Sequence, residues 1–127
     1  MPGIVTGHPN LFLRAEGLAV LVLAVLTYAT AGTGWLLFAV LVMLPDVSML
    51  GYLAGPRVGA AAYNLAHWYV WPLLLLGIGT VQHAPVLFSI GLIWMAHIGF
   101  DRLIKAGFKY PEGFRFSHLG GPSAPTP

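Results

Sequence analysis

The chain has 127 residues, of which 57% are hydrophobic and only 8% are charged, and its mean hydropathy is +0.80. This composition excludes an ordinary water-soluble domain and predicts an integral membrane protein. The net charge of +2 does not indicate nucleic-acid binding, and the absence of cysteine excludes disulfides and thiolate metal ligands.

Four apolar segments follow one another along the chain, separated by turns rich in Gly and Pro. A membrane-spanning helix needs about 20 mainly apolar residues, and we expect one in each segment. The segments are residues 11–30, 35–53, 58–81 and 85–105. Short turns are typical of antiparallel neighbours. The predicted fold is therefore all-α, a polytopic membrane protein built as a four-transmembrane-helix bundle.

The two ends of the chain need separate treatment. Arg14, the apolar run and "ATA" at 29–31 resemble a signal peptide, but Glu16 at the front of the run is unusual for one. We expect a retained first helix. After the fourth segment, basic and aromatic residues alternate, as in segments that lie on an anionic membrane surface. We predict a single membrane domain over residues 1–119, including this interfacial tail, and a disordered tail over 120–127.

The distribution of basic residues predicts the topology. With four spans, all six fall on one side of the membrane, whereas the turns at 31–34 and 82–84 contain no Lys or Arg. The six are Arg14, Arg57, Arg102, Lys105, Lys109 and Arg115. By the positive-inside rule, we expect a bacterial inner (cytoplasmic) membrane protein with both termini in the cytoplasm.

Each predicted helix places polar residues in the cytoplasmic half of the membrane. These residues are Glu16, Asp46, Asn64, His67, His97 and Asp101. Residues three or four apart share a helix face, and this spacing pairs His97 with Asp101. The same spacing pairs Asn64 with His67. A buried carboxylate costs roughly 2.5–3.5 kcal/mol on insertion scales, so something must compensate for it.

Three compensations fit these residues. A divalent metal ion would neutralise two carboxylates and bind neutral imidazoles, and Zn, Fe or Mn suits such ligands. A proton relay or ion pathway would use titrating acids and histidines. A static polar core would instead pair Asp101 with a neighbouring Arg or His. We adopt the metal site, because a generic bundle would not need two His and two Asp together.

The predicted site has ligands and one catalytic residue. Pro45, before Asp46, would disturb the second helix and free carbonyls at that depth. Glu16 is the candidate general base or a further ligand. His118 follows the basic, aromatic tail, which could fold back over the site as a lid. The candidate metal ligands are Asp46, His67, His97 and Asp101, with Asn64 and His118 as further candidates.

Several blocks resemble a known family. They are "LPDVSMLGYLAGPRVGAAAYNLAH" (44–67), "IGLIWMAHIGFDR" (90–102), "GFKYPEGF" (107–114) and "SHLG" (117–120). They resemble the signature blocks of a small bacterial four-span membrane family catalogued only as a domain of unknown function, number 4260. The resemblance covers nearly the whole chain and implies little about function, since that family is uncharacterised.

A looser similarity is more informative about chemistry. Leu-Pro-Asp at a helix end, a histidine on the next helix and a later His-x-x-x-Asp are similar to the inner-membrane metal-dependent hydrolases. That similarity implies metal ligands at Asp46, His67, His97 and Asp101. The chain departs from that class at "YNLAHWY", where the class has a "THS"-type motif.

The sequence leads to one leading hypothesis about function and leaves two others open. The first is metal-dependent hydrolysis of a lipid-like substrate at an intramembrane His/Asp/Glu site near the cytoplasmic side. The alternatives are a small proton- or ion-coupled transporter or channel, and an accessory subunit of a larger membrane complex. The expected partners are membrane lipids and either further copies of the chain or a larger membrane complex, with no nucleic acid.

Overall fold

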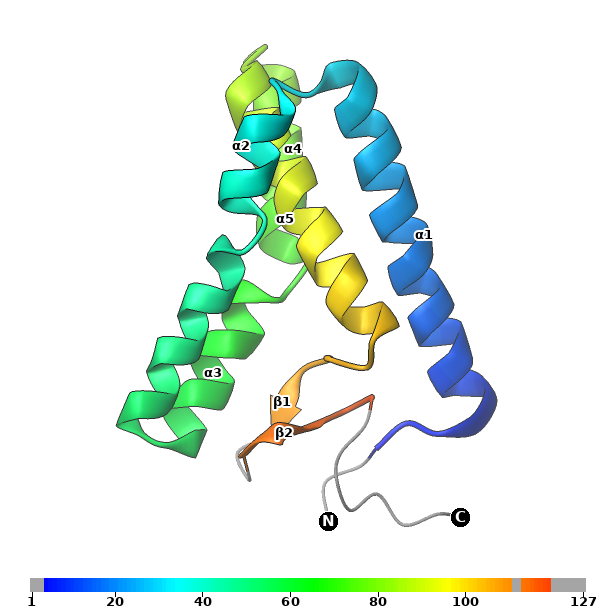
Figure 1. Ribbon diagram of the computed structural model, residues 1–127, viewed down its shortest axis with the longest axis vertical. Coiled ribbons are helices and arrows are strands. Elements are labelled where there is room, and N and C mark those ends of the chain that lie inside the picture. Colours follow the sequence, from blue (N-terminus) through cyan, green and yellow to red (C-terminus); the bar gives the residue numbers. More distant parts are fainter. Residues whose placement is uncertain (1–3, 111–112, 120–127) are drawn as a thin grey trace.

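The computed structural model describes residues 4–110 and 113–119. In chain order its elements are α1 (Gly7–Ala31), α2 (Trp35–Leu41), the 3₁₀ helix η1 (Leu44–Ala54), α3 (Pro56–Ala66), α4 (Val70–Val81), α5 (Pro85–Leu103), β1 (Lys109–Tyr110) and β2 (Gly113–Ser117). In Figure 1, α1 ascends the long axis, α2 and η1 descend, α3 and α4 ascend again, and α5 descends towards the strands. The predicted helical membrane fold class is confirmed.

Three segments are long and apolar enough to cross a membrane. They are α1, the α2–η1 segment and α5. Their outer faces carry large apolar side chains, such as Leu36 and Leu53, which are 79% and 88% exposed. The buried set, by contrast, includes His67, His97 and Asp101. Large apolar side chains therefore cover the outside, and several polar side chains are buried inside, as expected of a helical bundle in lipid.

The structure differs from the predicted single helix over 58–81. This segment forms α3 and α4, of 11 and 12 residues, with a break between Ala66 and Val70. Pro72 explains the break, because a proline ring clashes with the carbonyl four residues earlier and has no N–H to donate. Within the first turn of α4 that missing N–H costs nothing, since no helical acceptor is available there.

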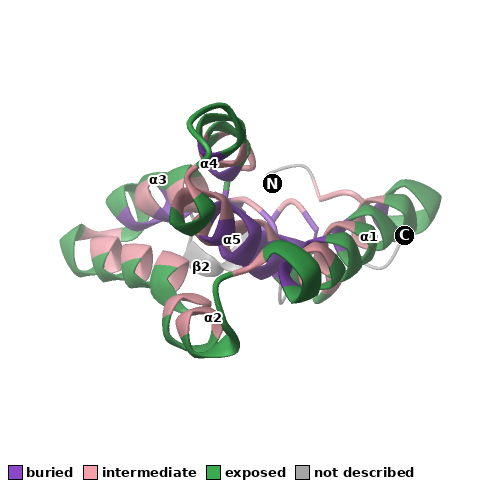
Figure 2. Cartoon of the chain, turned by 90° about the horizontal axis from the view of Figure 1, so that it is seen from above, coloured by how far each residue is buried: buried purple, intermediate pink, exposed green. Residues whose placement is uncertain are grey.

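The helix α5 forms the centre of the molecule, and in Figure 2 much of it is coloured as buried. It packs against α1 and α4. Gly17 of α1 and Gly99 of α5 allow the closest approach, since a Cβ built on Gly99 would lie 2.7 Å from the Gly17 carbonyl oxygen. Towards the other end, Tyr28 packs with Leu92 and Ile93. Small residues at the first contact and large ones at the second fix how these helices meet.

The predicted interfacial tail folds as an antiparallel β1–β2 hairpin that packs against α3. The chain's first described residues join it, because the Val5 N–H donates to the His118 carbonyl at 2.8 Å. Asn10 donates to the carbonyls of Val5 and Leu119 at 2.8 and 2.9 Å. The predicted disordered tail, 120–127, lies outside the described residues.

Candidate metal centre

The break between α2 and η1 orients His97. Pro45 has no N–H, and the chain tightens into a 3₁₀ helix in which the Asp46 N–H donates to the Met43 carbonyl at 3.1 Å. In an α-helix the Asp46 N–H would have bonded to the Val42 carbonyl. That carbonyl is instead available to His97, whose Nδ1–H donates to it at 2.5 Å.

The break between α3 and α4 orients His67. His67 caps the end of α3, and its Nδ1–H donates to the Tyr63 carbonyl at 2.8 Å. Its ring stacks on the Tyr63 ring, with 3.7 Å between centroids and 9° between planes. The Ala66 carbonyl, freed by the same break, accepts the indole N–H of Trp94 at 2.6 Å. The carbonyls freed by the two breaks, those of Val42 and Ala66, thus accept hydrogen bonds from side chains of α5. The Tyr63 carbonyl of α3 holds His67.

These contacts fix the tautomer of both imidazoles. A carbonyl only accepts, so each Nδ1 carries the proton and each neutral ring presents its Nε2 lone pair. The two Nε2 atoms of His67 and His97 face each other at 3.1 Å. Metal-bound histidines in proteins are commonly held in this way, with the other ring nitrogen donating to a carbonyl or carboxylate.

Two carboxylates complete a group of four side chains, His67, His97, Asp46 and Asp101, which is called the metal group below. Asp46 Oδ1 lies 3.2 Å from His67 Nε2 and 3.0 Å from His97 Nε2. Asp101 Oδ2 lies 3.1 and 3.2 Å from the same two atoms. Ligand atoms at 2.0–2.1 Å around a tetrahedral ion would be roughly 3.3 Å apart. The four atoms, all within 4.8 Å of one another, therefore have the size of a four-coordinate metal site.

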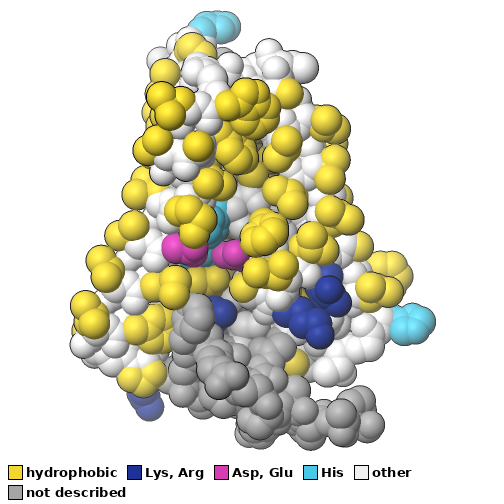
Figure 3. All heavy atoms as spheres, in the orientation of Figure 1, with side chains coloured by type: hydrophobic (Ala, Val, Ile, Leu, Met, Phe, Trp, Pro, Cys, Tyr) yellow, Lys and Arg dark blue, Asp and Glu magenta, His cyan; other side chains and the backbone are white. Residues whose placement is uncertain are grey.

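The group is more open on one side than on the other. The side chains of His67 and His97 are 2% and 5% exposed, whereas that of Asp46 is 28% exposed. Asp46 lines an open hollow with apolar neighbours, including Val47 and Leu50. In Figure 3, acidic and histidine side chains show in the middle of a mainly hydrophobic face. The site thus faces the surface that would meet lipid.

Tyr63 contacts the group and Lys109 lies over the Tyr63 ring, and sequence reasoning missed both. The Tyr63 hydroxyl donates to Asp101 Oδ2 at 3.3 Å, and the Lys109 ammonium lies 4.9 Å from the centre of the Tyr63 ring. Burial lowers the pKa of Lys109, while Asp101 and then Asp46 act to raise it. Tyr63 stands four residues before His67, a spacing that could have revealed it. Lys109 follows a turn, and its sequence position gave no such signal.

Four of the six predicted ligands come together, and Asn64 and His118 lie elsewhere. Asn64 clamps the hairpin, donating to the Lys109 carbonyl at 2.9 Å and accepting the Lys109 N–H at 2.5 Å. His118 accepts the Phe108 N–H on its Nδ1 at 2.9 Å. Asn64 therefore attaches the hairpin to α3, and His118 forms a hydrogen bond within the same tail.

Glu16, the predicted base, is exposed on α1 and is not a member of the group. Its charge acts on Arg102 and Tyr69. The Arg102 guanidinium lies 5.1 Å from the Tyr69 ring centre and 4.5 Å from that of Phe108. Glu16 therefore acts on Arg102, the residue that follows Asp101, and not on the metal group.

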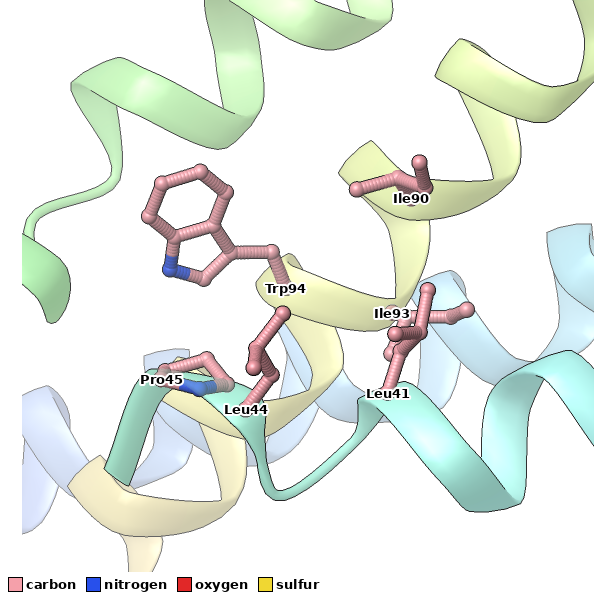
Figure 4. Close-up of a pocket in the computed structure, with 6 residues that line it drawn as sticks. All are labelled: Leu41, Leu44, Pro45, Ile90, Ile93 and Trp94. Carbon is pink, nitrogen blue, oxygen red and sulfur yellow. The ribbon is translucent and has the colours of Figure 1, made fainter. Parts of the chain in front are cut away.

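An apolar cavity of about 270 Å³ lies between α2, η1 and α5. Figure 4 shows its lining, which is Leu41, Leu44, Pro45, Ile90, Ile93 and Trp94. Pro45 adjoins Asp46 in the chain, and Ile93 lies one helical turn before His97. The cavity and the candidate ligands are therefore neighbours.

Fold and site together define a helical membrane protein with a buried His/Asp group that can hold a metal ion. The chain belongs to the family described as "Domain of unknown function (DUF4260)", whose model matches residues 10–121. The matched region includes all four members of the group. No curated protein and no solved structure matches the chain.

Proposed function

We propose that this protein binds a divalent metal ion, Zn, Fe or Mn, at Asp46, His67, His97 and Asp101 and uses it to hydrolyse a lipid-like substrate. One observation supports this above the others. Both imidazoles donate from Nδ1 to a carbonyl and direct their Nε2 lone pairs at each other and at two carboxylates. Such an arrangement repels itself unless a cation or additional protons lie between the four atoms.

The residues around the group have distinct roles in this proposal. A divalent ion held there would polarise an ester carbonyl and acidify a water molecule. Asp46, the most exposed member, would hold the ion through Oδ1, and its other carboxylate oxygen would accept a proton from water on the substrate side. Tyr63 holds Asp101 in its ligand orientation through the phenol hydrogen bond. Water adds across the ester bond, and the products are an acid and an alcohol.

The surroundings of the group favour a substrate that arrives from the membrane. Asp46 is flanked by apolar residues on an outer face, and an apolar cavity adjoins it. We place the site in the cytoplasmic half of a bacterial inner membrane, with both chain ends in the cytoplasm. The distribution of Lys and Arg supports this orientation.

Elemental analysis by plasma mass spectrometry tests the metal site. Detergent-purified protein is compared with the His97→Ala/Asp101→Ala double variant and with His8→Ala, which removes an exposed histidine outside the group. We expect near-stoichiometric metal in the native protein and His8→Ala, and its loss in the double variant. Circular dichroism confirms that each variant folds. Equal metal content in all three, or none in the native protein, would contradict the proposal.

Hydrolysis is tested with a long-chain p-nitrophenyl ester in mixed micelles. The metal-loaded protein should release p-nitrophenol, and removal of the metal with a chelator should abolish this. Compared at equal metal content, the conservative Asp46→Asn variant should be slower by about 100-fold or more, a typical loss for a positioned acid–base group. If chelated protein keeps full activity, metal-dependent hydrolysis is ruled out.

A further inference from the structure

The apolar cavity and the metal group lie along one face of α5. Ile90 and Ile93 line the cavity, and His97 and Asp101 belong to the metal group. These four residues follow one another at spacings of three or four, so their side chains form one row along the helix. Ile90 precedes His97 by seven residues, which is about 10 Å along a helix. An elongated molecule in the cavity would therefore end at the metal group.

The opposite wall of the cavity has the same order. In Figure 4, Leu41 and Ile90 lie at one end of the cavity, and Pro45 and Trp94 lie at the other. Asp46 follows Pro45 in the chain, so the Pro45 end is the one next to the metal group. The far end is then formed by Leu41 and Ile90.

The chemistry of the lining restricts what fills the cavity. All six lining side chains are apolar except for the indole N–H of Trp94, which already donates to the Ala66 carbonyl. A buried water molecule needs two to four polar partners, which these side chains do not offer. The cavity also lies between two segments that are long and apolar enough to cross a membrane, α2–η1 and α5. A hydrocarbon chain is therefore the occupant that fits.

The size of the cavity sets how much of a chain it holds. An apolar cavity of about 150 Å³ takes up benzene, which has six carbons, so about 270 Å³ gives room for about ten carbons. Carbons beyond these would extend past Ile90 and contact nothing inside the cavity.

We infer that the cavity binds one hydrocarbon chain of the substrate over about its first ten carbons, and that Ile90 determines this length. The inference rests on the proposed function and names the substrate class of the same site, esters with a chain of medium or greater length. The rest of the substrate extends into the hollow beside Asp46. Its lining residues Val47, Leu50 and Leu53 are 53%, 64% and 88% exposed, so the size of that part is not limited.

The test compares metal-loaded native protein with two variants. Ile90→Trp fills the far end of the cavity, and Val86→Trp places the same side chain at an exposed position of α5 outside the cavity lining. The substrates are p-nitrophenyl butyrate, decanoate and palmitate in the same mixed micelles. Each ester partitions into the micelles equally for all three proteins, so differences between proteins report on the cavity. Metal content is measured on every sample.

For the native protein and Val86→Trp, we expect kcat/KM to be higher with decanoate than with butyrate, and palmitate to give no further increase. In Ile90→Trp the ratio of decanoate to butyrate should fall about ten-fold or more, because a filled cavity resists further overpacking. If Ile90→Trp keeps its metal and the native ratio, the inference is wrong and the proposed hydrolysis stands.

A binding measurement decides the inference if no ester is hydrolysed. Decanol with a diazirine at the end of its chain is photolysed with the protein, and the labelled residues are located by mass spectrometry. Native protein and Val86→Trp should be labelled at Leu41 and Ile90, and excess decanol should displace this label. Ile90→Trp should show about ten-fold less of it. Such labelling without hydrolysis would refute the hydrolase and support the chain site. Label that excess decanol does not displace would overturn the inference.

Discussion

The helices of this protein fall into two groups, and the difference between them separates stability from function. α1 and α5 are continuous over 25 and 19 residues and pack closely through Gly17 and Gly99. The segments 35–54 and 56–81 are instead broken near Pro45 and Pro72. Of the four members of the metal group, two lie on the continuous α5 and two at or beside the breaks.

The breaks do more than interrupt a helix. Each frees a backbone carbonyl, and in a membrane such a group needs a partner inside the protein. The Val42 carbonyl takes the Nδ1–H of His97, and the Ala66 carbonyl takes the indole N–H of Trp94. A continuous helix would have used both carbonyls internally. The broken segments therefore orient the side chains of the site, while the continuous pair holds the bundle together.

The largest effect is expected from disrupting the continuous pair with Gly99→Leu. Its Cβ would lie 2.7 Å from the Gly17 carbonyl oxygen and 2.9 Å from the Leu21 nitrogen, both backbone atoms. Such overpacking should destabilise the protein by about 3 kcal/mol or more and lower its melting temperature in detergent by many degrees. The matched control is Gly77→Leu in α4, where an added Cβ meets nothing within 4 Å. Equal melting of the two variants would show that the close packing is unimportant.

A more selective effect is expected from repairing a break. Pro45→Ala restores an N–H and favours a regular helix, which would recapture the Val42 carbonyl from His97. Metal affinity, measured by competition with a chromophoric chelator, should fall about 10- to 100-fold, as when the hydrogen-bond partner of a metal-ligating side chain is removed. The melting temperature of metal-free protein should not fall. Pro85→Ala, at the start of α5, serves as the control and should leave affinity unchanged. Unchanged metal affinity in Pro45→Ala would show that the break near Pro45 does not position the metal ligands.

The smallest effect concerns the hairpin and its pH dependence. Burial and the charge of Arg102 lower the pKa of His118 below its usual 6.5. Protonation therefore costs more in the docked hairpin than in a released one. A protonated Nδ1 also no longer accepts the Phe108 N–H. Docking should be fully stable above about pH 6.5 and weaken as the pH falls below it.

Hydrogen exchange of residues 105–119, corrected for intrinsic rates, measures this effect. Protection should be lower at about pH 5.5 than at about pH 7.5, and His118→Asn should remove the pH dependence. Native protein with the same protection at both pH values would contradict the role given to His118.

The sequence predicted the members of the metal group better than the backbone that holds them. Asp46, His67, His97 and Asp101 could be found because charged and imidazole groups are costly in lipid and stand out at matching depths. The break at His67 was not predicted, because the two segments were treated as one helix although Pro56–Ala66 is much less apolar than Val70–Val81. A proline at the start of a helix also looks the same in sequence as a proline within one.

Long-range contacts account for the residues that sequence reasoning placed differently. Asn64 shares a face with His67 and so resembled a ligand, but its amide pairs with the Lys109 backbone, 45 residues away. Glu16 lies on α1, outside the group. Helical spacing predicts neighbours on one helix, and it carries no information about which tail segment docks against that helix.

The most direct test of the metal centre is X-ray absorption spectroscopy of the zinc-loaded protein in detergent. The account predicts one zinc ion with two imidazole nitrogens and two carboxylate oxygens at about 2.0–2.1 Å, and loss of one imidazole contribution in His97→Ala. Zinc bound without imidazole scattering, or a spectrum identical in His97→Ala, would contradict the claim that His67 and His97 hold the metal.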